Sequence, residues 1–162
     1  MAVEVSLSQG MVALVDDDDL ELVAPYKWHV TRDGRKKSNL YAVHSGTMNR
    51  PAMKMHRLIT GAPPGVDVDH RDGNGLNNTR CNLRICSRRE NAMNRPTQSG
   101  TSRFKGVSWD EKTRKWRAQL SVGGKRICIG RFASEKEAAV AYDVSSRDHY
   151  GEFAFVNFRE EV

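Results

Sequence analysis

Cysteine is scarce in this 162-residue sequence, which contains only Cys81, Cys86 and Cys128. An odd number of cysteines argues against a disulfide framework. Three cysteines cannot make a four-cysteine zinc site, and no pair has the Cys-X-X-Cys spacing of such sites. We therefore expect Cys81 and Cys86 to be small core residues rather than metal ligands.

Long apolar runs are also missing. The sequence has no stretch of about eighteen apolar residues, so we expect no membrane-spanning helix. Residues 1–10 lack both the basic head and the apolar stretch of a secretory signal. These two absences predict an intracellular protein.

Acidic residues are the minority among the charged ones. There are 26 Lys and Arg against 20 Asp and Glu, which gives a formal net charge of +6 and a pI near 9.4. Nine basic residues lie between Arg103 and Arg131, where Asp110 and Glu111 are the only acids. A dense basic segment is typical of a nucleic-acid-binding surface, although a merely soluble basic protein would share the net charge. The length allows one ordinary domain or two small ones, neither with a large core of its own.

Residues 1–50 predict a β-rich segment, to which we assign no chemistry. The acidic run Asp16–Asp19 can charge the start of a short helix, although it could instead be a metal cluster. A solvated helix start is the commoner use of such a run. The expected elements are a strand at Val12–Val15, a helix from the acidic run to Val23, and a hairpin of Tyr26–Thr31 and Leu40–Val43 around a turn at Asp33-Gly34.

Residues 51–95 alternate short apolar segments with one polar loop. The loop, Asp72–Asn78, is rich in Gly and Asn. Ser87 and Glu90 have the spacing of a capping box, in which a hydroxyl and a carboxylate satisfy the first free amides of a helix. The expected order is an amphipathic segment at Met53–Thr60, a breaker at Gly61–Gly65, a strand at Val66–His70, the loop, a strand at Leu83–Cys86 and a helix from Ser87.

Residues 96–103 are Pro, Gly and small polar residues, which predict a linker. After the linker, apolar residues alternate with polar ones from Trp116 to Val122, as in a half-buried strand. A second capping box at Ser134–Glu137 starts a helix that Gly151 ends. For 104–158 we expect a three-stranded antiparallel sheet packed on one helix, with strands at Phe104–Trp109, Lys115–Val122 and Lys125–Gly130.

A group of polar residues between Asp69 and Arg95 can carry chemistry. Asp69 and His70 are neighbours at a strand end, so the carboxylate can hold a divalent ion while the imidazole faces a water on the other side. Asn91 offers an amide oxygen as a second ligand for a hard cation. Arg95 follows on the same helix face and could hold a phosphate. Asn82 can bond backbone groups and fix the loop that aims His70.

This region resembles the HNH nucleases of the phage and intron-encoded homing-endonuclease type, over about residues 55–95. The resemblance implies a small ββα-metal nuclease module at 51–95. It rests on four blocks that follow one another at the family's spacing: Met55–Ile59, Val68–Gly73, Asn78–Arg84 and Ser87–Arg95.

The resemblance also implies a role for each motif residue. His70 would be the general base, Asp69 and Asn91 would bind one magnesium or manganese ion, and Asn82 would be structural. The third motif letter is here Asn91 rather than His, which suggests a weaker site for a harder ion. Arg71 and Arg95 are the expected phosphate contacts. His56, near the motif, is expected to be packed or to contact a phosphate.

The polar face of the second expected sheet carries hydrogen-bond donors on long side chains. A narrow sheet of this kind can lie in the major groove, where Arg reads guanine edges and other basic residues hold phosphates. Lys115, Arg117 and Gln119 alternate along the middle strand. The residues expected to contact DNA are Lys105, Ser108, Lys115, Arg117, Gln119, Arg126 and Arg131.

Residues 102–158 resemble the APETALA2-type DNA-binding domain, in which strand Arg and Trp residues contact bases. Cys128 stands at one of those Trp positions, so the family's base preference does not carry over. Trp109 and Trp116 are expected in the core. The matching blocks are Phe104–Val107, Lys115–Ala118, Ile129–Phe132, Ala138–Asp143 and Val156–Phe158.

The combined pattern predicts an α+β protein, in which a metal-dependent endonuclease module precedes a domain that selects sites on double-stranded DNA. The alternative is a DNA-binding regulator whose HNH module is only structural, against which the intact Asp69, His70 and Asn91 argue. An RNA-binding protein is disfavoured because the sheet lacks an aromatic pair placed for base stacking. We expect the protein in the cytoplasm of a bacterial host, at the nucleoid when bound to DNA. The pattern leaves the oligomeric state open.

Overall fold

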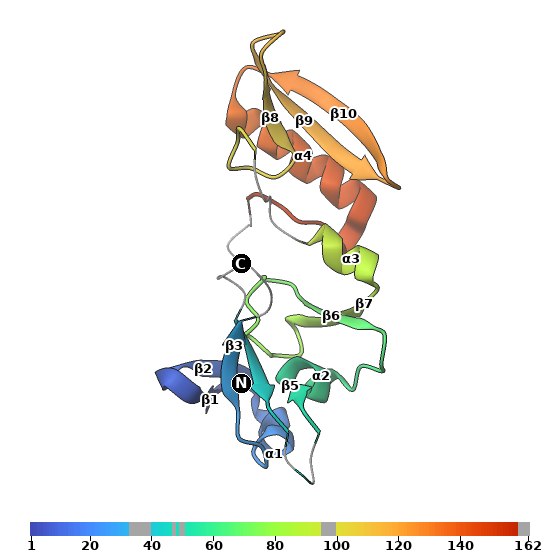
Figure 1. Cartoon of the computed structure of the whole chain (residues 1–162). Coiled ribbons are helices and arrows are strands. Elements are labelled where there is room, and N and C mark those ends of the chain that lie inside the picture. The colour runs from blue at the N-terminus through green and yellow to red at the C-terminus, as the bar shows by residue number, and fades with distance from the viewer. Residues whose placement is uncertain (33–39, 47, 49–50, 95–99, 159–162) are drawn as a thin grey trace. The chain divides into compact units, whose positions relative to one another are not determined.

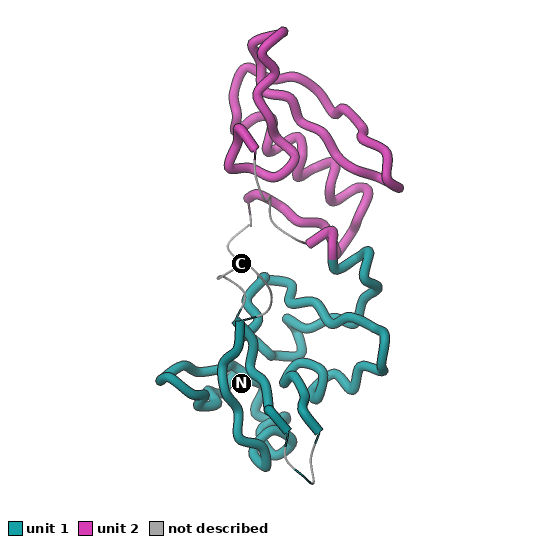
Figure 2. The backbone as a smooth tube through the Cα atoms, in the orientation of Figure 1, with its two compact units in different colours: residues 1–91 teal, residues 92–162 magenta. Residues whose placement is uncertain are grey.

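Short strands dominate the computed structural model, which describes residues 1–32, 40–46, 48, 51–94 and 100–158 (Figure 1). The fold is a mixture of α and β structure with several small sheets and few helices. It divides into two compact units, Met1–Asn91 and Ala92–Val162 (Figure 2), and each is described by itself. The expected turn at Asp33-Gly34 and the first half of the expected linker, residues 96–99, lie outside the described residues. None of the described helices is long and apolar enough to cross a lipid bilayer.

The first unit begins with two small sheets. Ala13 and Val15 point inward from the first hairpin, and the second contains the strand pair predicted on either side of residues 33–39. The short helix after the acidic run ends at Val23, as expected. The elements are β1 (Ala2–Ser6), η1 (Ser8–Gly10), β2 (Val12–Asp16), η2 (Asp17–Asp19), α1 (Leu20–Val23), β3 (His29–Arg32), β4 (Leu40–His44) and β5 (Met53–Lys54).

The rest of the first unit is a helix, a strand pair and a second helix. In the strand pair, Asp69 lies opposite Arg84 and His70 lies opposite Leu83. The expected capping box starts the last helix: Ser87 N donates to Glu90 Oε2 at 2.8 Å, and Glu90 N donates to Ser87 Oγ at 3.2 Å. The elements are α2 (Met55–Thr60), β6 (Asp67–His70), β7 (Leu83–Cys86) and α3 (Arg88–Met93).

One hydrophobic core joins residues from both sides of the boundary expected at residue 50. Val15 and Val23 from the N-terminal segment pack in the same cluster as Met55, Ile59 and Val68. A stretch of about 40 residues is too short to bury a core alone, so the N-terminal segment supplies part of it. The segment is therefore a structural part of the first unit.

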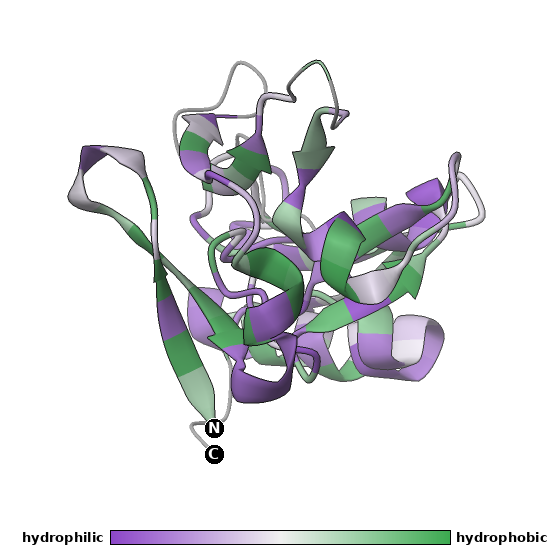
Figure 3. Ribbon diagram, turned by 90° about the horizontal axis from the view of Figure 1, so that it is seen from below, coloured by the Kyte–Doolittle hydropathy of each residue, from purple (hydrophilic) through white to green (hydrophobic). Residues whose placement is uncertain are grey.

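Hydrophilic and hydrophobic residues alternate along the strands (Figure 3), as expected for sheets with one buried face.

The second unit is a sheet in the order β10-β9-β8 with a helix packed on one face. Small residues of the helix, Ala138 and Ala139, meet Val107 and Ala118 of the sheet. The predicted capping box is present, with Lys136 N donating to Ser134 Oγ at 3.2 Å and Ser134 N to Glu137 Oε2 at 3.3 Å. The elements are β8 (Val107–Asp110), β9 (Lys115–Val122), β10 (Lys125–Phe132), α4 (Glu135–Tyr150) and η3 (Gly151–Phe153).

The first strand of this sheet starts three residues later than expected, after Gly106. Gly106 has φ +76°, and any Cβ there would overlap the ring of Tyr142 on α4. The helix therefore approaches the backbone closely at this point, and Phe104 and Lys105 lie before the strand. Trp116 packs against the core as predicted, with Trp109 in ring contact at 5.1 Å.

A buried carboxylate ties the C-terminal tail of the second unit to its helix. Asp143 accepts hydrogen bonds from the backbone N of Asn157 at 2.8 Å and of Phe158 at 2.9 Å. The Asn157 side chain in turn binds the backbone of Lys105, accepting from N at 2.7 Å and donating to O at 3.1 Å. Three sequence blocks that are distant along the chain are thus one hydrogen-bonded group.

Candidate active site

His70 ends β6 and is buried, with 5% of its surface exposed. Its ring lies 5.0 Å from that of His56 and 5.8 Å from that of Tyr41, so His56 is a packed residue, one of its two expected roles. Burial lowers the pKa of His70 below its usual value, against a smaller opposing effect of Asn78. The imidazole is therefore held in its neutral form, the form that can accept a proton.

Asn78 sets the orientation of that imidazole. Its Nδ2 donates to Leu76 O at 3.1 Å, which directs Oδ1 toward Nε2 of His70, 3.5 Å away. An amide oxygen only accepts, so this contact favours the proton on Nε2. The backbone N of Asn78 donates to Leu14 O at 2.7 Å, which ties the loop to β2. Sequence reasoning missed Asn78, although it lies within one of the motif blocks.

Asn82 closes the loop between β6 and β7. Its Oδ1 accepts from Asp72 N at 3.0 Å, and its Nδ2 donates to Asp72 Oδ1 at 3.0 Å and to Asn77 O at 2.8 Å. These bonds hold the two ends of the loop together behind His70. This is the structural role expected of Asn82, which was to bond backbone groups and fix the loop.

The acidic run of the N-terminal segment also supports the loop. Buried Asp19 binds the guanidinium of Arg80 at 2.6 and 2.9 Å, and Asp16 accepts from Arg80 N at 2.7 Å. Asp17 and Asp18 are exposed, as expected of a solvated helix start. Sequence reasoning missed this ion pair because its members are 61 residues apart.

Asp69 faces an arginine across the strand pair. Arg84 donates to Oδ2 of Asp69 from Nε at 2.8 Å and from Nη2 at 2.5 Å, and both residues are less than 10% exposed. Asp67, two residues earlier, shares this face of β6. Neither Asp67 nor Arg84 was predicted from the sequence as a site residue, although strand alternation places Asp67 beside Asp69.

Asn91 reaches the same face from α3. Its Nδ2 donates to Oδ2 of Asp67 at 2.9 Å. A carboxylate only accepts, so Asp67 must face the amide nitrogen, and Oδ1 of Asn91 is left at the other end of the amide. Asp67 therefore decides which atom of Asn91 is available as an oxygen ligand.

Carboxylate and amide oxygens fit a hard divalent cation. Asp69 and Asn91 offer one of each on a single face, and the orientation of Asn91 leaves its oxygen available. Among the described residues there is no group of three or more His, Cys, Asp or Glu that could hold a metal ion. The protein donors are therefore few, and water or phosphate oxygens would have to complete a coordination shell.

The remaining residues expected around the motif are placed as follows. The Arg71 side chain is exposed just after His70, and Arg95 lies outside the described residues. Cys86 is buried, which raises the pKa of its thiol to about 11. Cys81 is exposed, which corrects its expected core position, because it sits in the loop turn before β7 rather than in the strand.

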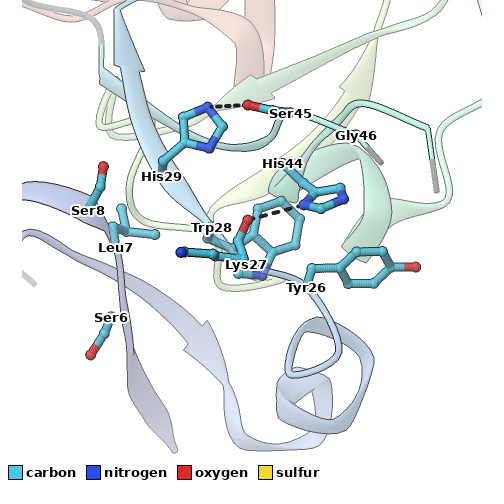
Figure 4. Close-up of a pocket in the computed structure, with 10 residues that line it drawn as sticks. All are labelled: Ser6, Leu7, Ser8, Tyr26, Lys27, Trp28, His29, His44, Ser45 and Gly46. Atoms are coloured by element: carbon cyan, nitrogen blue, oxygen red, sulfur yellow. Dashed lines mark hydrogen bonds between the residues drawn. The ribbon is translucent and has the colours of Figure 1, made fainter. Parts of the chain in front are cut away.

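A hollow of about 560 Å³ lies elsewhere in the first unit (Figure 4). His29 is hydrogen-bonded to Ser45 Oγ at 3.1 Å and His44 Nδ1 to Lys27 O at 3.1 Å, so two of its polar side chains bind other residues of the lining. None of the four motif residues lines it.

The exposed face of the second unit's sheet carries a row of polar residues. Ser108, Arg117 and Arg131 lie opposite one another on the three strands. A bulge between Cys128 and Gly130 brings Arg131 onto this face. Arg131 Nε binds Asp110 Oδ2 at 2.9 Å, whereas the buried Nε of Arg117 has no hydrogen-bond partner. Four more residues complete the polar face by register, namely Lys115, Gln119, Arg126 and Cys128.

Lys105 does not lie on this face, which corrects its expected position. It precedes β8, and its ammonium donates to Met93 O at 2.5 Å and sits 4.9 Å from the Phe155 ring centre. Burial lowers the pKa of Lys105 to about 8. The close approach at Gly106 delays the strand, so strand alternation does not apply to Lys105.

Comparisons with known proteins give one set of partial matches to plant transcription factors. Residues of this chain are 33% identical over 61 residues to an AP2-like ethylene-responsive transcription factor of Arabidopsis thaliana, a match that covers 36% of this chain and 18% of that protein. An AP2/ERF and B3 domain-containing transcription repressor of the same plant is 36% identical over 62 residues, or 17% of its length. These matches are partial.

The other matches are to a family model and to two viral proteins. A family model described as HNH endonuclease matches residues 54–93. Protein 3.8 of Escherichia phage T7 is 42% identical over 65 residues, which are 40% of this chain and 54% of that protein. An uncharacterized HNH endonuclease of Acanthamoeba polyphaga mimivirus is 30% identical over 155 residues, 92% of this chain and 76% of the relative. With this last match along nearly the whole chain, and with the motif residues on β6, in the loop just before β7 and on α3, the protein belongs to the HNH endonuclease family.

Proposed function

We propose that the protein is a metal-dependent, homing-endonuclease-like enzyme that hydrolyses phosphodiester bonds of double-stranded DNA at sites selected by its second unit. The observation that carries the proposal is the geometry of β6. Its last residue is a buried, neutral histidine, and the residue before it, Asp69, shares the opposite face of the strand with Asp67, whose carboxylate orients the amide of Asn91. A base and a cation site on either side of one strand end can flank a scissile phosphate.

His70 is the general base of this proposal. With the proton on Nε2, where Asn78 Oδ1 faces it, Nδ1 is the nitrogen that takes the proton of the attacking water. Packing against His56 and Tyr41 holds the ring in place, and Asn82 holds the loop behind it. These residues position the base before DNA arrives, which is the condition for an efficient proton transfer.

Asp69 and Asn91 are the proposed ligands of one magnesium or manganese ion. When bound, such an ion stabilises the charge that develops on the scissile phosphate and on the leaving 3′ oxygen. Asp67 keeps the amide of Asn91 turned with its oxygen outward. Arg71 and Arg95 would contact neighbouring phosphates through charge-assisted hydrogen bonds.

The polar face of the second unit's sheet is the proposed reader of DNA. Arg117 lies at its centre with an unsatisfied Nε, and Lys115 and Arg126 are exposed around it. The partial similarity to AP2-type plant transcription factors supports an APETALA2-type domain here. Ser108, Gln119 and Arg131 complete the proposed contact surface.

Plasmid nicking tests the enzyme against the alternative, a DNA-binding regulator without activity. Supercoiled DNA should be relaxed by the wild-type protein with Mg²⁺ or Mn²⁺ and left intact with EDTA, because Asp69 and Asn91 need the cation to act on phosphate. Agarose gels report the product. DNA binding without any metal-dependent nicking would favour the regulator.

Asp67 is expected to act through Asn91, and a rescue experiment tests this role. Asp67→Ala frees the amide to turn, so we expect nicking to need a Mn²⁺ concentration about tenfold higher, as is usual when a residue that orients a metal ligand is removed. In an Asn91→Asp background the two carboxylate oxygens are equivalent, and Asp67→Ala should cost little. The Mn²⁺ concentration for half-maximal rate is the readout. An equal loss in both backgrounds would mean that Asp67 has only a structural role.

A further inference from the structure

The ion pair between Arg84 and Asp69 places a positive charge at the carboxylate that the proposed function assigns to the cation. Both partners are buried, and two guanidinium nitrogens contact the same oxygen at 2.5 and 2.8 Å. A buried carboxylate without a counter-charge is strongly unfavourable. In the protein without a bound ion, Arg84 is therefore the counter-charge of Asp69.

The register of the strand pair keeps Arg84 in this position. Arg84 lies directly opposite Asp69, and its neighbour on the same face of β7, Cys86, lies opposite Asp67. Cys86 is a neutral thiol, because burial raises its pKa to about 11. The face thus holds two carboxylates, one guanidinium and the amide of Asn91.

We infer that Arg84 is a resident competitor of the divalent cation at Asp69, so that the free protein binds metal weakly and binds it well only on DNA. Two cations that share one carboxylate repel each other strongly in a poorly hydrated site. A DNA phosphate adds a second anion, which Arg84 can bind as the cation takes Asp69. This inference rests on the proposed function, and it makes the metal site dependent on DNA.

The experiment is a titration of full-length protein with Mn²⁺ in the absence of DNA, in which the electron paramagnetic resonance signal of free Mn²⁺ gives the affinity. Arg84→Gln removes the charge and keeps an amide donor for Asp69. Arg84→Lys keeps the charge on a single, more flexible ammonium. Arg80→Gln and Arg80→Lys are matched controls, because Arg80 is paired with Asp19 at 2.6 Å in the same unit but not with Asp69.

We expect Arg84→Gln to bind Mn²⁺ about tenfold or more tighter than the wild type, because the repulsion at Asp69 is gone. Arg84→Lys should lie between the two. Both Arg80 variants should stay within about threefold of the wild type, since the charge they change is paired with Asp19 and largely exposed to solvent, where it is screened. Adding Asp69→Asn to Arg84→Gln should abolish the gain. A gain that survives this second change would overturn the inference.

The inference would also be overturned if Arg84→Gln and Arg80→Gln bound Mn²⁺ with equal affinity. Circular dichroism with and without Mn²⁺ covers the case in which Arg84→Gln does not fold alone. Refolding on addition of Mn²⁺ would support the inference, because the cation then replaces the lost counter-charge. If it folds in neither condition, Arg84→Lys decides, and wild-type affinity there rejects the inference. Metal-dependent nicking by the wild type, measured separately, reports on the proposed function itself.

Discussion

His70→Ala is expected to lower the rate of DNA cleavage by about 100- to 10,000-fold, the usual contribution of a general base. The structure gives the reason, because this imidazole is neutral, buried and held by Asn78 at the end of β6. DNA affinity should remain nearly unchanged, since the proposed contacts to bases and most phosphates lie elsewhere. Single-turnover nicking with Mg²⁺ gives the rate, and fluorescence anisotropy without metal gives the affinity.

His29→Ala is the matched control for this experiment. His29 is a partly buried histidine of the same unit that bonds Ser45 and lies outside the motif. The His29→Ala variant should cleave DNA at close to the wild-type rate. Near-normal cleavage by His70→Ala at neutral pH would remove His70 from the role of base. A parallel loss in both variants would point instead to damage of the shared fold, which thermal unfolding of each variant would reveal.

Removal of residues 101–162 is expected to leave a fragment that still nicks DNA slowly but no longer prefers one site. The first unit has its own core and contains Asp69, His70 and Asn91. The sheet that carries Arg117 is lost, together with its phosphate contacts. The dependence of log affinity on log salt should become shallower by about one for each contact removed.

Point variants separate base reading from phosphate binding on the sheet. Arg117→Ala should cost about 1–3 kcal/mol of discrimination between a preferred site and random DNA, as for a lost bidentate base contact. Lys115→Ala should weaken binding evenly over sequences. Competition binding and cleavage at fixed salt measure both effects. If the fragment and the full chain prefer the same site equally, sequence reading belongs to the first unit and the sheet is a nonspecific clamp.

Much of the local structure could be predicted because it depends on neighbouring residues. Both capping boxes, at Ser87 and Ser134, form from residues three apart. The strand Lys115–Val122 follows from its alternation alone. The predicted bounds of a strand were wrong where a contact between residues distant in the sequence shapes the backbone. β8 begins late because Tyr142 approaches Gly106.

The candidate site, too, was predicted only in part from the sequence. The spacing of Asp69, His70, Asn82 and Asn91 along the sequence predicted an HNH motif before any contact was known, and Asn82 bonds the loop as that motif requires. The sequence did not reveal the partners of these residues. Asp67 beside Asn91, and Asn78 beside His70, emerge only when loop and helix fold back on the strand pair.

By itself, the sequence determined the family, the order of the elements and the motif residues, because periodicity, capping and motif spacing are properties of nearby positions. Only the tertiary structure decided that the first 50 residues complete the core of the first unit, that Arg80 binds Asp19, and that Arg84 holds Asp69. These contacts join residues from 15 to 61 positions apart. Strand register and burial select them, since a buried charge must find whichever opposite charge the fold places beside it.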